Sequence, residues 1–118
     1  MKANLTFRPN VRLTKELNSK GEAFIIIRLS FNKKRVNLGT GYTISPEKWD
    51  EKAEKVKRNA ANSQNFTFAE INDGIANLIS IINGIFKKYE QSGEGYPTIE
   101  QVKEEFRIAT NRKEKVEK

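Results

Sequence analysis

The sequence predicts an α+β domain in which a three-stranded antiparallel β-sheet packs on one long α-helix, with a short C-terminal helix after it. Apolar and polar residues alternate along the first 40 residues, and apolar residues recur at steps of three and four between residues 71 and 89. These are the periods of half-buried strands and of an amphipathic helix. The chain has 118 residues, of which 36% are hydrophobic, so we expect one small domain with a modest core and tails.

The strands are expected within residues 4–42. From Leu5 to Leu13 the apolar residues fall on odd positions. Pro9 cannot donate to a sheet hydrogen bond, so this strand is predicted to be an edge strand or to contain a bulge. Residues 24–31 and 35–40 alternate in the same way, and Asn32–Lys34 forms the turn between them. The resulting sheet is apolar on one face and largely basic on the other.

The long helix is expected over about residues 65–91. Its apolar positions fall within about 120° of arc, the width of a helix packed on a core. Thr67 and Glu70 have the spacing of a capping box at its start. A three-stranded sheet is marginally stable without a partner layer, so we expect the helix to lie across its apolar face.

Residues 45–50 are predicted to form a short turn, in which Ser45 and Pro46 suit the N-cap and first helical positions. Trp49, the only tryptophan, is better explained as a core residue than as a base-stacking one. Residues 50–62 carry mixed charges and few apolar residues, and we predict a solvated loop. Its segment Lys55–Arg58 could still touch a phosphate backbone.

After the helix, residues 92–97 are predicted to be a linker. Thr98 and Gln101 repeat the capping-box spacing and start a short helix over residues 98–108. Ile99, Val102 and Phe106 lie on one side of it. From residue 109 onward the chain is charged and lacks apolar periodicity, so we expect either a frayed end or a tether to a further region there.

The whole net charge of the chain, +7, lies in residues 1–40, which hold nine Lys or Arg residues and two acids. A charge excess confined to one small sheet indicates a polyanionic partner, and nucleic acid is the first candidate. The chain has no Cys and no His, and we expect no metal, no other cofactor and no small-molecule substrate. Its apolar runs are shorter than the roughly 20 residues a bilayer requires. We therefore expect a cytoplasmic protein without a membrane partner.

Three segments, residues 23–35, 38–44 and 46–50, carry a resemblance. They give a basic hairpin, a Thr-Gly turn and a Pro-x-x-Trp-Asp element, followed by a basic loop and the long helix. This order, over about the first 90 residues, resembles the N-terminal arm-DNA-binding domain of tyrosine recombinases (phage-type integrases), particularly those of Bacteroides-type mobile elements. The resemblance implies a sheet that enters the major groove of double-stranded DNA at arm-type sites.

The resemblance also implies a division of the chain and a set of DNA-binding residues. Residues 1–91 would form the arm-binding domain, and residues 92–118 would lead to a core-binding and catalytic region. The residues that the resemblance implies bind DNA are Arg8, Asn10, Arg12, Ile26, Arg28, Ser30, Arg35 and Asn37. We add Lys33 and Lys34 to the predicted DNA-binding residues because they lie in the turn, where a lysine can contact a phosphate. The full-length protein would be a recombinase that contacts other integrase domains and protomers, whereas this stretch, which lacks the catalytic residues, would not cleave DNA.

Several roles stay open at the level of single residues. Arg28, at the centre of the middle strand, is the first choice for contact with a base, and Arg12 and Arg35 are next. Ile26 could contact a thymine methyl group or be an ordinary exposed isoleucine. For each turn lysine, simple solvation competes with phosphate contact. The family commonly has glycine where Lys33 stands, so the turn is expected to be longer or to hold a strained φ.

Two other functions compete with binding to duplex DNA. An RNA-binding module also uses a basic sheet, but the outward positions lack the paired aromatic residues that stack bases. A protein-interaction domain could use the amphipathic helix or residues 98–108. An enzyme is the weakest alternative, because Gly39-x-Gly41 lacks the third glycine and the following helix of a phosphate-binding loop.

Overall fold

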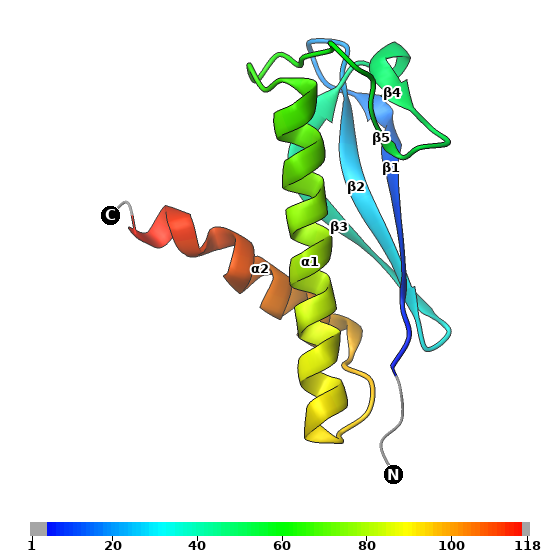
Figure 1. Ribbon diagram of the computed structural model, residues 1–118, viewed down its shortest axis with the longest axis vertical. Coiled ribbons are helices and arrows are strands. Elements are labelled where there is room, and N and C mark those ends of the chain that lie inside the picture. The colour runs from blue at the N-terminus through cyan, green and yellow to red at the C-terminus, as the bar shows by residue number, and fades with distance from the viewer. Residues whose placement is uncertain (1–4, 117–118) are drawn as a thin grey trace.

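A computed structural model describes residues 5–116 of the chain, with side chains as far as residue 110. Figure 1 shows an antiparallel three-stranded sheet with α1 lying over one face and α2 leading away from it. This confirms the predicted α+β fold. The elements in chain order are β1 (Arg8–Leu17), β2 (Ala23–Phe31), β3 (Lys34–Ile44), the 3₁₀ turn η1 (Pro46–Lys48), β4 (Trp49–Asp50), β5 (Lys55–Val56), α1 (Phe68–Ser92) and α2 (Ile99–Val116).

The sheet has the order β1-β2-β3, so that β2 is central and β1 is an edge strand, as Pro9 indicated. The inward residues of β2 are almost fully buried; they are Ile25, Ile27, Leu29 and Phe31. Leu5 and Phe7, expected within the first strand, precede β1 and still pack against the core. The Phe7 ring stacks on Phe86 of α1 at 4.6 Å between centroids.

The turn between β2 and β3 contains only two residues, because Phe31 pairs with Lys34. Asn32 has φ 49° and Lys33 has φ 62°. Both central positions of a type I′ turn need positive φ, which Asn and Gly adopt more readily than Lys. Of the two alternatives expected for this turn, the structure therefore shows the strained one.

Helix α1 begins with the predicted capping box. The Glu70 backbone N–H donates to Thr67 Oγ1 at 3.2 Å, and the Thr67 backbone N–H donates to Glu70 Oε1 at 2.9 Å. The helix ends at Gly93, whose φ is 77°. Its buried residues, which belong to the same core as those of β2, are Ile71, Ile75, Ile82, Ile85, Phe86 and Tyr89. The long helix therefore covers the apolar face of the sheet, as predicted.

One helix glycine has a clear packing role. A Cβ atom at Gly74 would overlap the Tyr42 ring, with Tyr42 Cζ at 2.7 Å. Gly84, the other glycine inside α1, has open space around it. Glycine at position 74 therefore lets Tyr42 lie against the helix, and the same ring makes an edge contact with Phe66.

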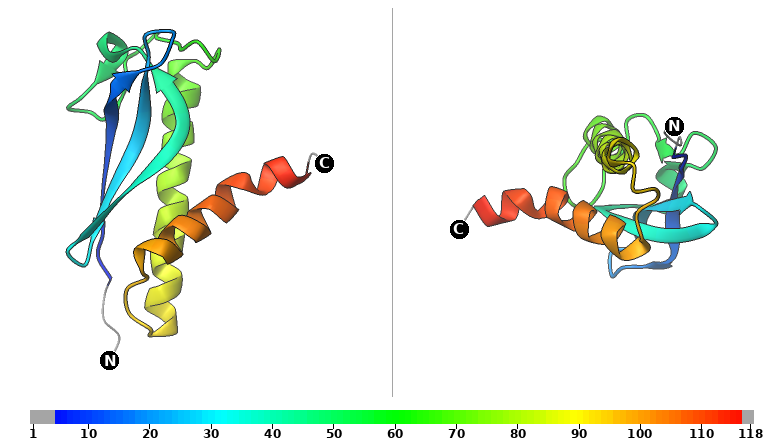
Figure 2. Two further views of the ribbon diagram at one scale, coloured as in Figure 1. Left: turned by 180° about the vertical axis from the view of Figure 1, so that it is seen from behind. Right: turned by 90° about the horizontal axis from the view of Figure 1, so that it is seen from below.

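The folded unit continues beyond residue 91, where the sequence indicated a linker. Pro97 is fully buried, and Val102 and Phe106 of α2 belong to the common core. The second capping box is present, with Thr98 and Gln101 bonded to each other in both directions. Seen from behind (Figure 2, left), α2 passes beside the sheet, and it contacts β3 and α1. The start of α2 therefore packs on the sheet and on α1.

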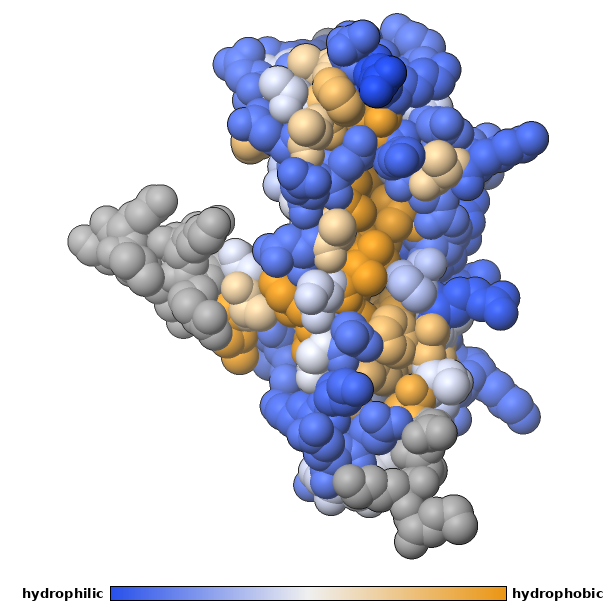
Figure 3. All heavy atoms as spheres, viewed as in Figure 1, coloured by the Kyte–Doolittle hydropathy of each residue, from blue (hydrophilic) through white to orange (hydrophobic). Residues whose placement is uncertain are grey.

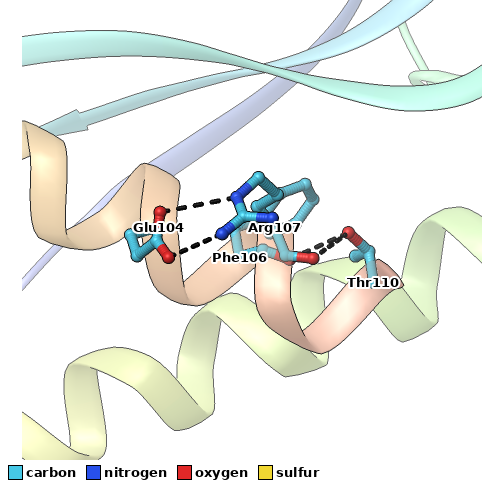
Figure 4. Close-up of polar contacts among 4 residues, drawn as sticks. All are labelled: Glu104, Phe106, Arg107 and Thr110. Atoms are coloured by element: carbon cyan, nitrogen blue, oxygen red, sulfur yellow. Dashed lines mark hydrogen bonds and ion pairs between the residues drawn. The ribbon is translucent and has the colours of Figure 1, made fainter. Parts of the chain in front are cut away.

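Helix α2 also runs to Val116, past the end expected at residue 108. The charged residues of this segment are mostly Lys, Arg and Glu, which have high helix propensity and need no apolar periodicity. Figure 4 shows Arg107 paired with Glu104, with Nη2 and Oε2 2.7 Å apart, and Thr110 Oγ1 donating to the Phe106 carbonyl at 2.9 Å.

The predicted solvated loop over residues 50–62 is wrong in its first half, which forms the β4–β5 hairpin. Trp49 pairs with Val56, and both are in the core. Asn72 of α1 fixes the hairpin, because its side chain accepts from the Val56 N–H at 2.8 Å and donates to the Val56 carbonyl at 3.1 Å. Local polarity concealed this packing, which depends on two apolar residues that are seven positions apart.

Among the residues whose side chains the structure describes, one charged group is buried, that of Glu22. The Glu22 carboxylate accepts from Thr43 Oγ1 at 2.6 Å and from the backbone and hydroxyl of Ser63 at 2.8 and 2.7 Å. Burial raises the pKa of Glu22, but these hydrogen bonds and the charge of Lys48 outweigh it, so the pKa is lowered overall. Glu22 therefore ties the β1–β2 turn to the segment before α1 as a carboxylate.

The side of the molecule that carries α1 combines apolar and charged surface. Figure 3 shows apolar atoms running along α1 and beside it, bordered by hydrophilic residues. In the described residues, no helix combines the length and the apolar character that crossing a membrane requires.

Candidate nucleic-acid interface

The structure places all eight predicted strand residues on the outward face of the sheet. Arg8, Asn10 and Arg12 come from β1. Ile26, Arg28 and Ser30 come from β2, and Arg35 and Asn37 come from β3. Each is half-buried or exposed, whereas the residues between them on β2 are buried. The two turn residues, Lys33 and Lys34, are exposed at one end of this face.

The strand register arranges these side chains in three rows across the sheet. Residues that pair directly across strands point to the same face. The rows are Arg8, Ser30 and Arg35, then Asn10, Arg28 and Asn37, then Arg12, Ile26 and Gly39. Arg28 therefore occupies the centre, with an asparagine on each neighbouring strand.

The arginines of this face are close enough to influence one another. Partial burial lowers the pKa of Arg28, and the positive charges of Arg12 and Arg35 lower it further. The Arg28 guanidinium is held from one side, because its Nε donates to Asn37 Oδ1 at 3.2 Å. Its two terminal nitrogens have no protein partner in the described residues. Arg12, Arg28 and Arg35 thus present one guanidinium group from each of the three adjacent strands.

Within the described residues, none of these cations forms an ion pair with an acidic side chain. In the described part of the chain, the ion pairs are Lys88 with Glu105 and Arg107 with Glu104, both on the helices. At the turn end of the sheet, Arg8, Lys33 and Lys34 help to line a pocket of about 390 Å³. The outward face and its turn are therefore available to an anionic ligand.

Two residues of this region were missed by the analysis of the sequence. Phe24, which the alternation along residues 24–31 puts on the same face as Ile26, is 47% exposed, but it was left out of the predicted DNA-binding residues. Glu54, in the β4–β5 hairpin, accepts from Asn10 Nδ2 at 2.6 Å and from the Val11 N–H at 3.0 Å. No local signal could have found Glu54, because 44 residues separate it from Asn10.

The described residues contain no group of three or more His, Cys, Asp or Glu side chains that could hold a metal ion. The candidate site is a surface on which arginine, asparagine and lysine side chains can donate hydrogen bonds. Arginine and asparagine side chains are suited to hydrogen bonds with base edges, and lysines are suited to phosphates.

Comparison with known proteins agrees with this chemistry. A family model described as an arm DNA-binding domain matches residues 11–103, which include the outward-face residues from Arg12 onward, α1 and the start of α2. Searches of the curated proteins and of the solved structures found no match. The match covers most of the chain, and the chain therefore belongs to the family of arm DNA-binding domains, whose function is to bind DNA.

Proposed function

We propose that the domain binds double-stranded DNA sequence-specifically by placing the outward face of its sheet in the major groove. In this proposal it acts at arm-type sites as the N-terminal domain of a tyrosine recombinase. The observation that carries the proposal is the set of three guanidinium groups, from Arg12, Arg28 and Arg35, on three adjacent strands. The recombinase context is supported by the order of motifs along the chain and by the family.

The dimensions of the sheet suit the groove. Adjacent strands are about 4.8 Å apart, so the outer strands of the sheet are about 10 Å apart, and the major groove is about 12 Å wide. Successive outward residues of one strand are about 6.7 Å apart, which corresponds to about two base-pair steps. The three rows of the face can thus address about five base pairs.

The roles of individual side chains follow from their positions. Arg28 lies in the central row, and its free terminal nitrogens can make the bidentate contact to guanine O6 and N7. Arg12 and Arg35 flank it on the neighbouring strands. Lys33 and Lys34 lie at the end of the sheet, where a lysine serves as a point charge for a backbone phosphate.

The test starts from a pool of DNA duplexes with a randomised segment, from which the protein selects its preferred sequence. We call the result the selected duplex, and a duplex of the same composition in shuffled order the scrambled duplex. Fluorescence anisotropy at fixed salt should show binding to the selected duplex tighter by a factor of about 10³ or more. Equal affinity for the two duplexes would contradict sequence-specific binding.

Two further experiments test the RNA-binding alternative and the recombinase context. Tighter binding to single-stranded RNA than to the selected duplex would favour an RNA-binding module. The selected sequence should also recur on the flanks of the crossover region of the element that encodes the protein. Its absence from those flanks would contradict the assignment to arm-type sites.

A further inference from the structure

We propose that Glu54 and Asn10 are positioning residues that hold the Arg12 guanidinium for contact with a base. The inference rests on the proposed function, because it assigns roles within the same outward face. It differs from the expectation for Asn10, which the resemblance placed among the residues that contact DNA.

The three side chains form one hydrogen-bonded series. Glu54 Oε2 accepts from Asn10 Nδ2 at 2.6 Å, and Asn10 Oδ1 accepts from Arg12 Nη1 at 3.4 Å. The other carboxylate oxygen of Glu54, Oε1, accepts from the Val11 N–H at 3.0 Å. Both oxygens of Glu54 are therefore engaged by β1, on either side of the peptide bond between Asn10 and Val11.

The chemistry of the three side chains determines which way the amide group of Asn10 is oriented. An ionised carboxylate can only accept hydrogen bonds, whereas the asparagine amide has a donor end and an acceptor end. Glu54 therefore requires the NH₂ group of Asn10 to face it, which turns Oδ1 toward Arg12. A guanidinium can only donate, so this is the orientation that allows Asn10 to hold Arg12.

A second observation concerns the backbone of Glu54. Its backbone has φ 57°, in the left-handed region that glycine and asparagine adopt more readily. Strain of this kind persists where the surroundings demand it, and it is concentrated at functional sites. A negative charge at the edge of a DNA-binding face also opposes the approach of phosphates. Both costs are understandable if the carboxylate has a specific task there.

The same face contains a second pair built on the same principle. Arg28 Nε donates to Asn37 Oδ1 at 3.2 Å, across the β2–β3 pairing. Each asparagine of the face therefore presents its oxygen to an arginine. In the Arg12 pair the asparagine is itself fixed by an acid, which makes that pair open to a sharp test.

The test compares two variants that remove the same charge from the same hairpin. In Glu54→Gln, the side chain has only one oxygen, whereas Glu54 accepts from two donors, Asn10 Nδ2 and the Val11 N–H. If the glutamine oxygen keeps the Val11 N–H, its NH₂ group faces Asn10. Asn10 is then expected to turn its oxygen toward the glutamine and its own NH₂ toward Arg12. Glu51→Gln is the matched control, because Glu51 is exposed in the turn between β4 and β5. Bulk electrostatics alone predicts that both variants bind all DNA equally well or more tightly.

The inference predicts a different result for Glu54→Gln. Its affinity for the selected duplex should fall about tenfold, which lies within the range that one arginine–base contact contributes, while its affinity for the scrambled duplex should not fall. Glu51→Gln should show no such loss. If Glu54→Gln behaves like Glu51→Gln while the unaltered protein still prefers the selected duplex, the inference is overturned and the proposed function stands. If the unaltered protein shows no preference, the proposed function fails first.

A second variant guards against a purely structural effect of Glu54. Asn10→Ala leaves the Glu54–Val11 bond in place and should cause the same selective loss. The double variant should lose no more than either single one, because residues that act in series are not additive. Thermal melting of each variant checks the fold. Additive losses, or equal losses on both duplexes, would show that Glu54 only attaches the hairpin to β1.

Discussion

The two faces of β2 differ completely although their residues alternate along one strand. Ile25, Ile27 and Leu29 are at most 1% exposed and lie in the core with α1. Ile26, Arg28 and Ser30, the residues next to them, are half-buried on the opposite face. The inward residues determine the fold, and we infer that the outward residues determine the binding. Substitutions on the two faces should therefore have separable effects.

The largest expected effect is the loss of stability in Ile27→Ala, and the adjacent Ile26 provides the comparison. Ile27→Ala should lower the free energy of unfolding by about 2–5 kcal/mol, because it leaves a cavity in a fully buried site. Ile26→Ala changes the same residue type on the outward face and should cost less than about 1 kcal/mol. Urea denaturation measures both. Similar losses for the two variants would remove the distinction between the faces.

The next effect concerns binding. Arg28→Ala should leave the free energy of unfolding almost unchanged and weaken the selected duplex by about 1–3 kcal/mol, the contribution of one bidentate base contact. The scrambled duplex should be affected much less. Lys34→Ala is the control, since loss of a phosphate contact weakens all duplexes alike and reduces the salt slope by about 0.9. Equal losses on both duplexes for Arg28→Ala would argue against contact with a base.

Lowering the pH should affect Glu22, whose carboxylate is buried. The pKa of Glu22 is lowered in the folded protein, so its stabilising effect is complete above the ordinary pKa of 4.5 and is lost as the pH falls through the folded value. Hydrogen bonds to charged groups contribute about 1.5–3 kcal/mol. Acidification through the folded pKa of Glu22 should therefore destabilise the protein. Denaturation between neutral and acid pH should show a smaller pH dependence for Glu22→Gln than for the unaltered protein.

Alanine substitutions at the two glycines inside α1 test how tightly the helix is packed at each position. Gly84→Ala should stabilise the protein by about 1 kcal/mol, because alanine favours a helix and the space is open. Gly74→Ala should instead destabilise it by about 1 kcal/mol or more, because the new methyl group overlaps the Tyr42 ring. Thermal melting distinguishes them. A gain in both variants would mean that Tyr42 moves aside freely.

The smallest effect sharpens the role of Ile26. If it contacts a thymine methyl group, replacing that thymine by deoxyuridine should cost about 0.8 kcal/mol, the value of one buried methylene. The substitution should make no difference to Ile26→Ala. A scan of each thymine in the selected duplex by anisotropy provides the measurement. If no position shows this pattern, Ile26 is simply an exposed isoleucine.

The elements with strong local periodicity could be predicted from the sequence. The alternation in β2 and the apolar stripe of α1 depend on residues close together in the chain, and the structure has both. The β4–β5 hairpin could not be predicted, because it needs Trp49 and Val56 to meet in a core built by distant segments. The end of α2 was missed because helix propensity, not apolar packing, continues it.

The candidate site also contains features that the sequence could predict and features that it could not. Alternation alone placed the arginines of three strands on one face, and the register of the strands in the structure brings them into rows. The partners of Asn10 could not be inferred, because Glu54 is 44 residues away and reaches β1 only through the hairpin. Hydrogen bonds between distant segments decide the orientation of polar side chains, and the sequence pattern carries no record of them.

The central claim is that the outward face of the sheet contacts DNA, and NMR tests it most directly. Backbone amide signals would be followed residue by residue while the selected duplex is added to labelled protein. The account predicts shifts that cluster on residues 8–12, 26–30 and 33–37. Shifts confined to α1 and α2, with the sheet signals unchanged, would contradict it.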